Sequence, residues 1–250
     1  MTEEQSPRAG DELAAKTRIH AVYLQLRRDI LDGKFRPGAR LPVEHLKAGY
    51  GVSAGTVREA LSLLVADALV TPEGQRGFWV TPVSEDDLTD ITNTRMQLES
   101  LALRQAIRLG DDAWEAAIVA AFHRLGLIED GAGQPLEGRL DEWEHRNQEF
   151  HDALIAACPS RWLKRFRGIL YHQHERYRRL SLWLGSAERN VHAEHEAILS
   201  AALRREEDKA CELMERHIGQ TRDMLLRSGL TGSGWLDAAG LTSARTTSAR

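Results

Sequence analysis

Three of the ten histidines are placed where their imidazoles could act together. His151, His195 and His217 each lie on the apolar side of a separate helical stretch, so all three should point into one bundle interior. Asn147 lies one turn before His151 and shares its face. Three imidazoles and one oxygen ligand would suit Zn(II), Ni(II) or Mn(II). The alternative is that each histidine is a hydrogen-bonded core residue, and these residues alone leave both interpretations open.

The elements that must position these residues are helices, because residues 84–228 follow a helical periodicity almost throughout. The expected helices cover residues 85–109, 111–125, 141–157, 161–184, 187–205 and 207–227. The glycine-rich segment 126–138 is the expected break between the second and third helices. We therefore predict a linker at 83–92, which includes the start of the first helix. An all-helical domain for effector binding, metal binding and dimerisation should follow at 93–228.

A different architecture is predicted for the N-terminal part. Residues 1–17 are polar and read as a flexible arm, whereas a helical pattern starts at Arg18 and ends at the turn residues 32–38. A short helix at 43–49 and a third helix capped by Ser53 follow, and then two short strands at 69–71 and 78–80. Three helices and a hairpin over residues 18–82 form a winged helix-turn-helix. The fold class is therefore mostly α, and residues 229–250 are predicted to be a disordered tail.

The first turn of the third helix is the predicted DNA-reading edge. In helix-turn-helix proteins this end enters the major groove, where Thr56 and Arg58 could contact base edges or phosphates. Arg76 at the tip of the hairpin could reach the minor groove or the backbone. The predicted DNA-binding residues are Ser53, Gly55, Thr56, Arg58, Arg76, Gly77, Arg36, Arg40 and Lys47. The alternative for the last three is that they are solvated surface charges.

The charge distribution, the apolar runs and the cysteine content limit the classes of protein to which this chain could belong. The net charge of the chain is −4, but residues 18–82 carry nine Lys and Arg against six Asp and Glu. A basic segment on an acidic body indicates where a polyanion would bind. We find no apolar run long enough to span a membrane, no secretion signal, and only two cysteines without framework spacing, so a cytoplasmic protein with reduced thiols is expected. HExxH, Walker and dinucleotide-binding motifs are missing from the sequence.

The N-terminal sequence resembles the gluconate-operon (GntR) family of bacterial repressors. The resemblance covers residues 18–82 and is carried by the stretches 24–30, 37–41, 50–53 and 57–61. It implies a winged helix-turn-helix that binds DNA. Two positions depart from the family pattern, because Ala54 and Thr56 stand where the family often has Arg and Pro. The loss of that Arg removes a guanine contact and implies a different operator.

The C-terminal part resembles the FCD subgroup of this family. The resemblance is carried by residues 95–99, 149–151, 194–199 and 210–217. It implies a metal held by one Asp and three His, and a carboxylate effector bound against the metal. Here Asn147 replaces the Asp. A neutral ligand should bind the metal less tightly and leave a site that attracts anions more strongly.

The effector carboxylate should meet a cation inside this domain. Arg95 is the first candidate, with Tyr177 and Arg178 as further effector-binding residues. The alternative for Arg95 is a surface ion pair with Glu99, one helical turn away. The stretches 92–109, 143–154 and 175–180 resemble the carbon-starvation-induced regulators, which suggests a dicarboxylate such as glutarate.

Together these features predict a homodimeric transcription regulator that binds a palindromic double-stranded DNA operator. A repressor is expected rather than an activator. A small carboxylate would release it or alter its binding. The alternative is a metal sensor in which the ion itself is the signal. An enzyme is not expected, because Asn147 cannot serve as a general base and the side chain of Glu149 should face away from His151.

Overall fold

The computed structural model describes residues 9–129, 139–183, 189–229 and 234. Along the chain, the described residues divide into two compact units, with the boundary between Val83 and Ser84. Each unit has a separate apolar core. The two units are therefore described one at a time.

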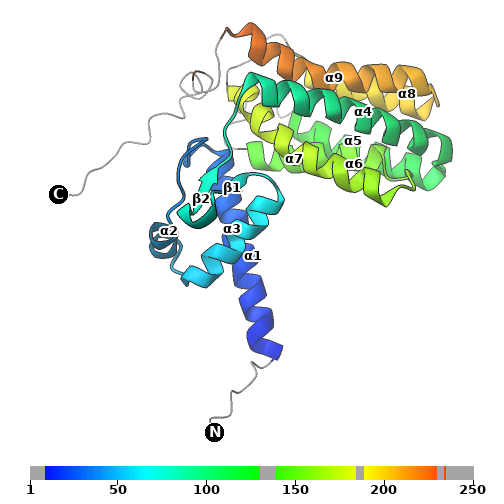
Figure 1. Cartoon of the computed structure of the whole chain (residues 1–250). Helices are drawn as coiled ribbons and strands as arrows, with labels where there is room; N and C mark the ends of the chain where they lie inside the picture. Colours follow the sequence, from blue (N-terminus) through cyan, green and yellow to red (C-terminus); the bar gives the residue numbers. More distant parts are fainter. Residues whose placement is uncertain (1–8, 130–138, 184–188, 230–233, 235–250) are drawn as a thin grey trace. The chain divides into compact units, whose positions relative to one another are not determined.

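The N-terminal unit contains three helices and a two-stranded hairpin (Figure 1). The helices are α1 (Ala9–Leu31), α2 (Val43–Tyr50) and α3 (Ala54–Ala66), and the strands are β1 (Val70–Pro72) and β2 (Phe78–Val80). The strands are antiparallel, with Val70 opposite Val80. Leu26 of α1 and Leu61 of α3 are fully buried in the core. The predicted winged helix-turn-helix is confirmed.

The turn between α2 and α3 depends on two residues. Gly51 ends α2 with a φ of 65°, in the left-handed region that favours glycine. Ser53 caps α3, because its hydroxyl accepts a hydrogen bond from the backbone N–H of Thr56 at 3.1 Å. The cap predicted at Ser53 is confirmed. This pair sets the direction in which α3 leaves the turn.

The start of α1 was predicted wrongly. Residues 9–17 were expected in a flexible arm, but the helix begins at Ala9. The segment lacks an apolar stripe, yet it is rich in Ala, Leu, Glu and Lys, which favour helix without any tertiary contact. The rest of the expected arm, residues 1–8, lies outside the described residues.

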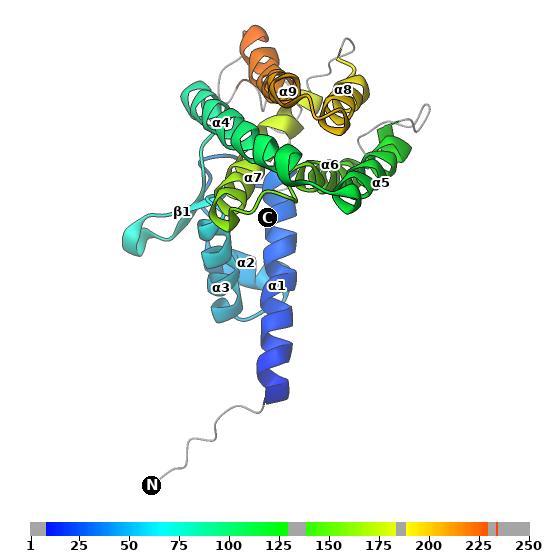
Figure 2. The same cartoon turned by 90° about the vertical axis from the view of Figure 1, so that its right-hand side faces the viewer.

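The C-terminal unit is all-helical over its described residues, as predicted. It contains α4 (Glu85–Leu109), α5 (Asp112–Glu129), α6 (Leu140–Leu154), α7 (Arg161–Trp183), α8 (Val191–Leu203) and α9 (Glu207–Arg227). Helix α4 packs against α7 and α9, and α5 packs against α6 and α8 (Figure 2). Within the described part of the chain, no helix has the length and apolarity that crossing a membrane requires.

Several helix boundaries in this unit differ from the prediction. Helix α5 continues through Gly126 to Glu129, because Leu125 and Ile128 extend its buried stripe. Helix α6 ends at Leu154 rather than residue 157, because the amides that follow bond three residues back, as Cys158 does to Ile155, and so form a turn. The expected break at 130–138 and most of the predicted tail lie outside the described residues.

Helix α8 also differs from the prediction. It begins at Val191 rather than residue 187, after a cap in which the side chain of Asn190 accepts from the N–H of Ala193. It ends at Leu203 rather than residue 205, because Arg205 has a φ of 59° and leaves the helical region.

Candidate metal centre and nucleic-acid interface

The start of α3 is open to solvent where DNA contacts were predicted. Ser53, Gly55 and Arg58 are exposed, whereas Val57 is fully buried in the core. The hydroxyls of Ser53 and Thr56 are also 2.9 Å apart and share a hydrogen bond. The cap therefore orients Thr56 while Arg58 extends outward from the next position. This arrangement can bind a nucleic acid groove.

The hairpin carries the second group of predicted contacts. Arg76 is exposed, and Gly77 has a φ of 114°, which only glycine adopts readily. The guanidinium of Arg40 donates to the carbonyl of Arg76 at 3.1 Å and lies over the ring of Trp79. Arg40 is therefore held against the wing, with its side chain on the exposed side of the hairpin.

The remaining two predicted phosphate contacts are both exposed. Arg36 lies in the turn after α1, and the ammonium of Lys47 is 2.6 Å from the carboxylate of Glu44 on the same helix. An exposed pair of this kind contributes little to stability, so a phosphate could replace Glu44 at small cost.

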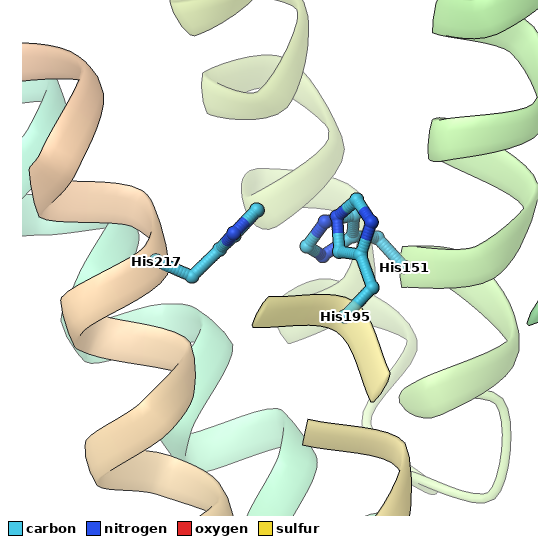
Figure 3. A group of neighbouring side chains, drawn as sticks. All are labelled: His151, His195 and His217. Atoms are coloured by element: carbon cyan, nitrogen blue, oxygen red, sulfur yellow. The ribbon is translucent and has the colours of Figure 1, made fainter. Parts of the chain in front are cut away.

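In the C-terminal unit, the three predicted histidines come together. His151 of α6, His195 of α8 and His217 of α9 are all buried, and one ligand nitrogen from each lies within 4.8 Å of the others (Figure 3). The ring centroids of His195 and His217 are 4.7 Å apart. Residues separated by up to 66 positions thus meet in one bundle interior, and their donor set suits a divalent transition metal.

Two carboxylates orient these imidazoles. Nδ1 of His195 is 3.1 Å from Oε1 of Glu129, and Nδ1 of His217 is 2.7 Å from Oε2 of Glu194. A neutral imidazole that donates from Nδ1 leaves the lone pair on Nε2 free for a metal. Among the described residues, Nε2 of His195 finds no hydrogen-bond partner. Histidine ligands in metalloproteins are held by carboxylates in the same way.

The protonation states also suit metal binding. Burial lowers the pKa of His151 well below its usual value, with a further contribution from His217. Burial lowers the pKa of His217 to about 3, against the opposing effect of the hydrogen bond with Glu194. Both rings are therefore neutral at pH 7, as metal ligands must be.

Asn147 lies buried on α6, one turn from His151. Its amide nitrogen donates to the hydroxyl of Tyr171 at 2.7 Å, and the Tyr171 ring is 5.9 Å from that of His151. No described residue donates to Oδ1 of Asn147. A buried amide oxygen without a donor is consistent with a ligand position.

Two predicted effector-binding arginines are buried beside this centre. Arg95 is 2% exposed and forms an ion pair with Glu99 at 3.3 Å. The pair with Glu99 is therefore real, but it is not on the surface. Arg178 is bound by both carboxylate oxygens of Glu144, at 2.7 and 3.2 Å. Both guanidinium groups lie over the ring of Tyr171.

Tyr177, the third predicted effector-binding residue, contacts the start of α4. Its hydroxyl donates to the carboxylate of Asp87 at 2.6 Å and is 3.2 Å from both the N–H and the carbonyl of Ser84. Ser84 caps α4, so Tyr177 of α7 binds the first turn of α4. The sequence indicated a basic aromatic run at 176–179 on one helix, but it could not show which helix end Tyr177 meets.

Several residues of the centre were missed. Glu129 also binds His192, at 2.8 Å, and its role was hidden because the predicted helix stopped at residue 125. Glu194 directly precedes His195 in the sequence, so the Glu-His-Glu run could have indicated it. Arg167 and His174 of α7 were also missed. Arg167 binds Glu99 and His174 binds Arg95, and contacts between distant helices of this kind leave no pattern in the local sequence.

Comparisons with known proteins identify both units. Residues 18–80 match the gntR family of bacterial regulatory proteins, and residues 90–220 match the FCD domain family. The uncharacterized HTH-type transcriptional regulator BphR of Paraburkholderia xenovorans (strain LB400) is 47% identical over 85% of this chain and 86% of its own. The HTH-type transcriptional repressor GlaR of Escherichia coli (strain K12) is 38% identical over 78% of this chain and 90% of its own. The structure of E. coli McbR/YncC has the same fold, with a TM-score of 0.68 and 20% identity over 85% of this chain and 98% of that one.

Proposed function

This chain belongs to the gntR family of bacterial transcription regulators and carries an FCD domain, and from this premise we propose that it is a ligand-responsive repressor. It would bind a palindromic operator as a homodimer and be released by a small carboxylate held in the C-terminal unit. The repressor assignment is supported by the name of the E. coli relative. The relatives are named as transcription regulators rather than enzymes.

DNA recognition is assigned to the exposed start of α3 and to the wing. Arg58 would supply a base or phosphate contact, while Arg40 and Arg76 would follow the backbone beside the hairpin. A single unit of this size reads only a short sequence. Two units related by a two-fold axis would read an inverted repeat, which is why we propose a homodimer.

The observation that carries the ligand response is the cluster of three buried imidazoles beside buried guanidinium groups. His151, His195 and His217 would hold a divalent metal ion, with Oδ1 of Asn147 as a fourth ligand. The bound ion supplies a Lewis acid for a carboxylate oxygen. None of these four ligands carries a negative charge, so the ligand set itself does not neutralise the ion, which favours an anion as a further ligand.

Arg95 and Arg178 would add hydrogen-bond donors for the effector carboxylate. Each is paired with one glutamate, so neither has to be neutralised by the effector, and each keeps further N–H donors. The effector can act only through a difference in affinity between conformations that fit the operator and conformations that do not.

The experiment begins with the full-length chain treated with a chelator. Operator sequences are selected from random duplex DNA, and binding is followed by fluorescence anisotropy with zinc alone, glutarate alone, or both. We expect selected sites with two-fold symmetry. We also expect zinc and glutarate together to weaken DNA binding by at least about tenfold. The Arg58→Ala variant should lose the selected site and still bind glutarate.

The outcomes separate the alternatives. Selected sites without symmetry would contradict the homodimer on a palindrome. Release by zinc alone would make the ion the signal, as in the metal-sensor alternative. Unchanged binding with zinc and glutarate together would contradict the proposed carboxylate response.

A further inference from the structure

His174 is neither one of the proposed metal ligands nor part of the DNA interface. It lies on α7 and is fully buried. Its Nδ1 is 3.1 Å from Nη1 of Arg95 and 3.5 Å from Nη1 of Arg178. A guanidinium group can only donate hydrogen bonds, so Nδ1 must be the acceptor and cannot carry a proton.

The other ring nitrogen must therefore hold the proton. The ring is neutral, because burial and the charges of Arg95 and Arg178 lower the pKa of His174 well below its usual value. A neutral imidazole has one N–H, which here is on Nε2. Nε2 is buried, and no described residue accepts from it. His174 thus presents an oriented hydrogen-bond donor with no acceptor in the described part of the chain.

Other unpartnered polar atoms accompany this donor. Nη2 of Arg167 is buried without an acceptor, although Nε of the same residue binds Glu99 at 2.8 Å. The guanidinium groups of Arg95, Arg167 and Arg178 all lie over the ring of Tyr171. The Tyr171 ring is itself 5.9 Å from the ring of His151, so the cluster of three histidines lies next to this group. Buried polar groups in native proteins almost always have a partner, which implies that a bound molecule supplies one here.

We propose that the Nε2–H of His174 donates a hydrogen bond to a carboxylate oxygen of the effector, which makes His174 a specificity-determining residue. This inference rests on the proposed function. Arg95 and Arg178 hold the imidazole in the tautomer that donates, so they act on the effector partly through His174. The site would then distinguish ligands by a hydrogen-bond acceptor at this position.

The first test reads the tautomer directly. Nitrogen-15 NMR of the full-length, zinc-loaded chain with labelled histidines should show His174 as the Nε2–H form, assigned by its loss in His174→Gln. Its signals should shift when glutarate is added. A proton on Nδ1, or a charged ring at pH 7, would overturn the inference whatever the ligand.

The second test uses two variants that separate the acceptor role of Nδ1 from the donor role of Nε2. In His174→Asn an amide replaces Nδ1 and the Nε2–H donor is lost, whereas His174→Gln places an amide N–H near the position of Nε2. We expect His174→Asn to bind glutarate at least about tenfold more weakly by calorimetry, and His174→Gln to recover part of that loss. His172→Asn, on the same helix but 31% exposed, is the matched control and should bind as the wild type does.

Zinc titration and the thermal midpoint of each variant report whether the fold and the metal centre are intact. If the wild type binds glutarate and His174→Asn binds it equally well, the role of His174 is overturned while the proposed carboxylate effector stands. Failure of the zinc-loaded wild type to bind glutarate would contradict the proposed carboxylate effector, and with it this inference.

Discussion

At the scale of single residues, Asn147 has the largest consequence for the chemistry of the centre. Its Oδ1 is buried without a donor, while its amide nitrogen is held by Tyr171. An amide is a neutral and weaker ligand than a carboxylate, so Asn147 in the proposed centre should lower the metal affinity and strengthen the attraction to anions. The same substitution was visible in the sequence, but its environment was not.

The Asn147→Asp substitution tests this interpretation. The amide of Asn147 donates to the Tyr171 hydroxyl, whereas the new carboxylate would accept from it. The added charge should raise zinc affinity by about tenfold or more while weakening glutarate binding. Calorimetric titration of the chelator-treated variant with zinc measures the first effect. Glutarate titration of the loaded protein measures the second. Zinc affinity equal to that of the wild type would mean that residue 147 does not bind the ion.

At the scale of elements, α7 connects the centre to the start of α4. Tyr171, His174 and Arg178 lie at the centre, and Tyr177 binds the first turn of α4 through Ser84 and Asp87. That turn directly follows the boundary between the two units. A shift of α7 on effector binding would therefore change how the first turn of α4 is held.

Replacing Tyr177 with Phe should separate effector binding from DNA release. The ring stays buried, so the cost is the lost hydrogen bonds, roughly 1 kcal/mol. Zinc and glutarate affinities should be unchanged. The weakening of DNA binding by glutarate, measured as a ratio of dissociation constants by anisotropy, should fall about fivefold.

A matched control exists in the winged unit. Tyr23 also donates to an aspartate at 2.6 Å, through Asp67, so Tyr23→Phe removes a similar bond far from α7 in the sequence. It should keep the full response to glutarate. An equal response in Tyr177→Phe and wild type would show that the contact with α4 does not carry the signal.

The elements also show what the sequence could predict. Apolar periodicity located α4 and α9 to the residue, and it put His151, His195 and His217 on inward faces, because burial imposes the period. It missed the start of α1, where the residues have high helix propensity but form no apolar stripe. The roles of Glu129 and His174 could not be predicted, because a contact between distant helices leaves no pattern in the local sequence.

At the scale of the whole molecule, buried neutral histidines make stability depend on pH. The pKa of His217 is about 3 in the folded chain, against 6.5 in an unfolded one, and the pKa of His151 is also lowered by burial. Above pH 6.5 these rings are neutral in both states. Below pH 6.5 the unfolded chain binds protons that the folded chain excludes, so the free energy of unfolding falls as the pH falls.

We expect the chelated protein to lose up to about 1.4 kcal/mol per pH unit for each such histidine between pH 6.5 and about 4. Urea unfolding followed by circular dichroism at several pH values measures this slope. The two units can unfold separately, so the relevant transition is the one that zinc moves to higher urea. His217→Gln removes one titrating group, so the dependence of the unfolding free energy on pH should fall by the contribution of about one proton. A slope that is the same in variant and wild type would show that His217 is not held neutral by the fold.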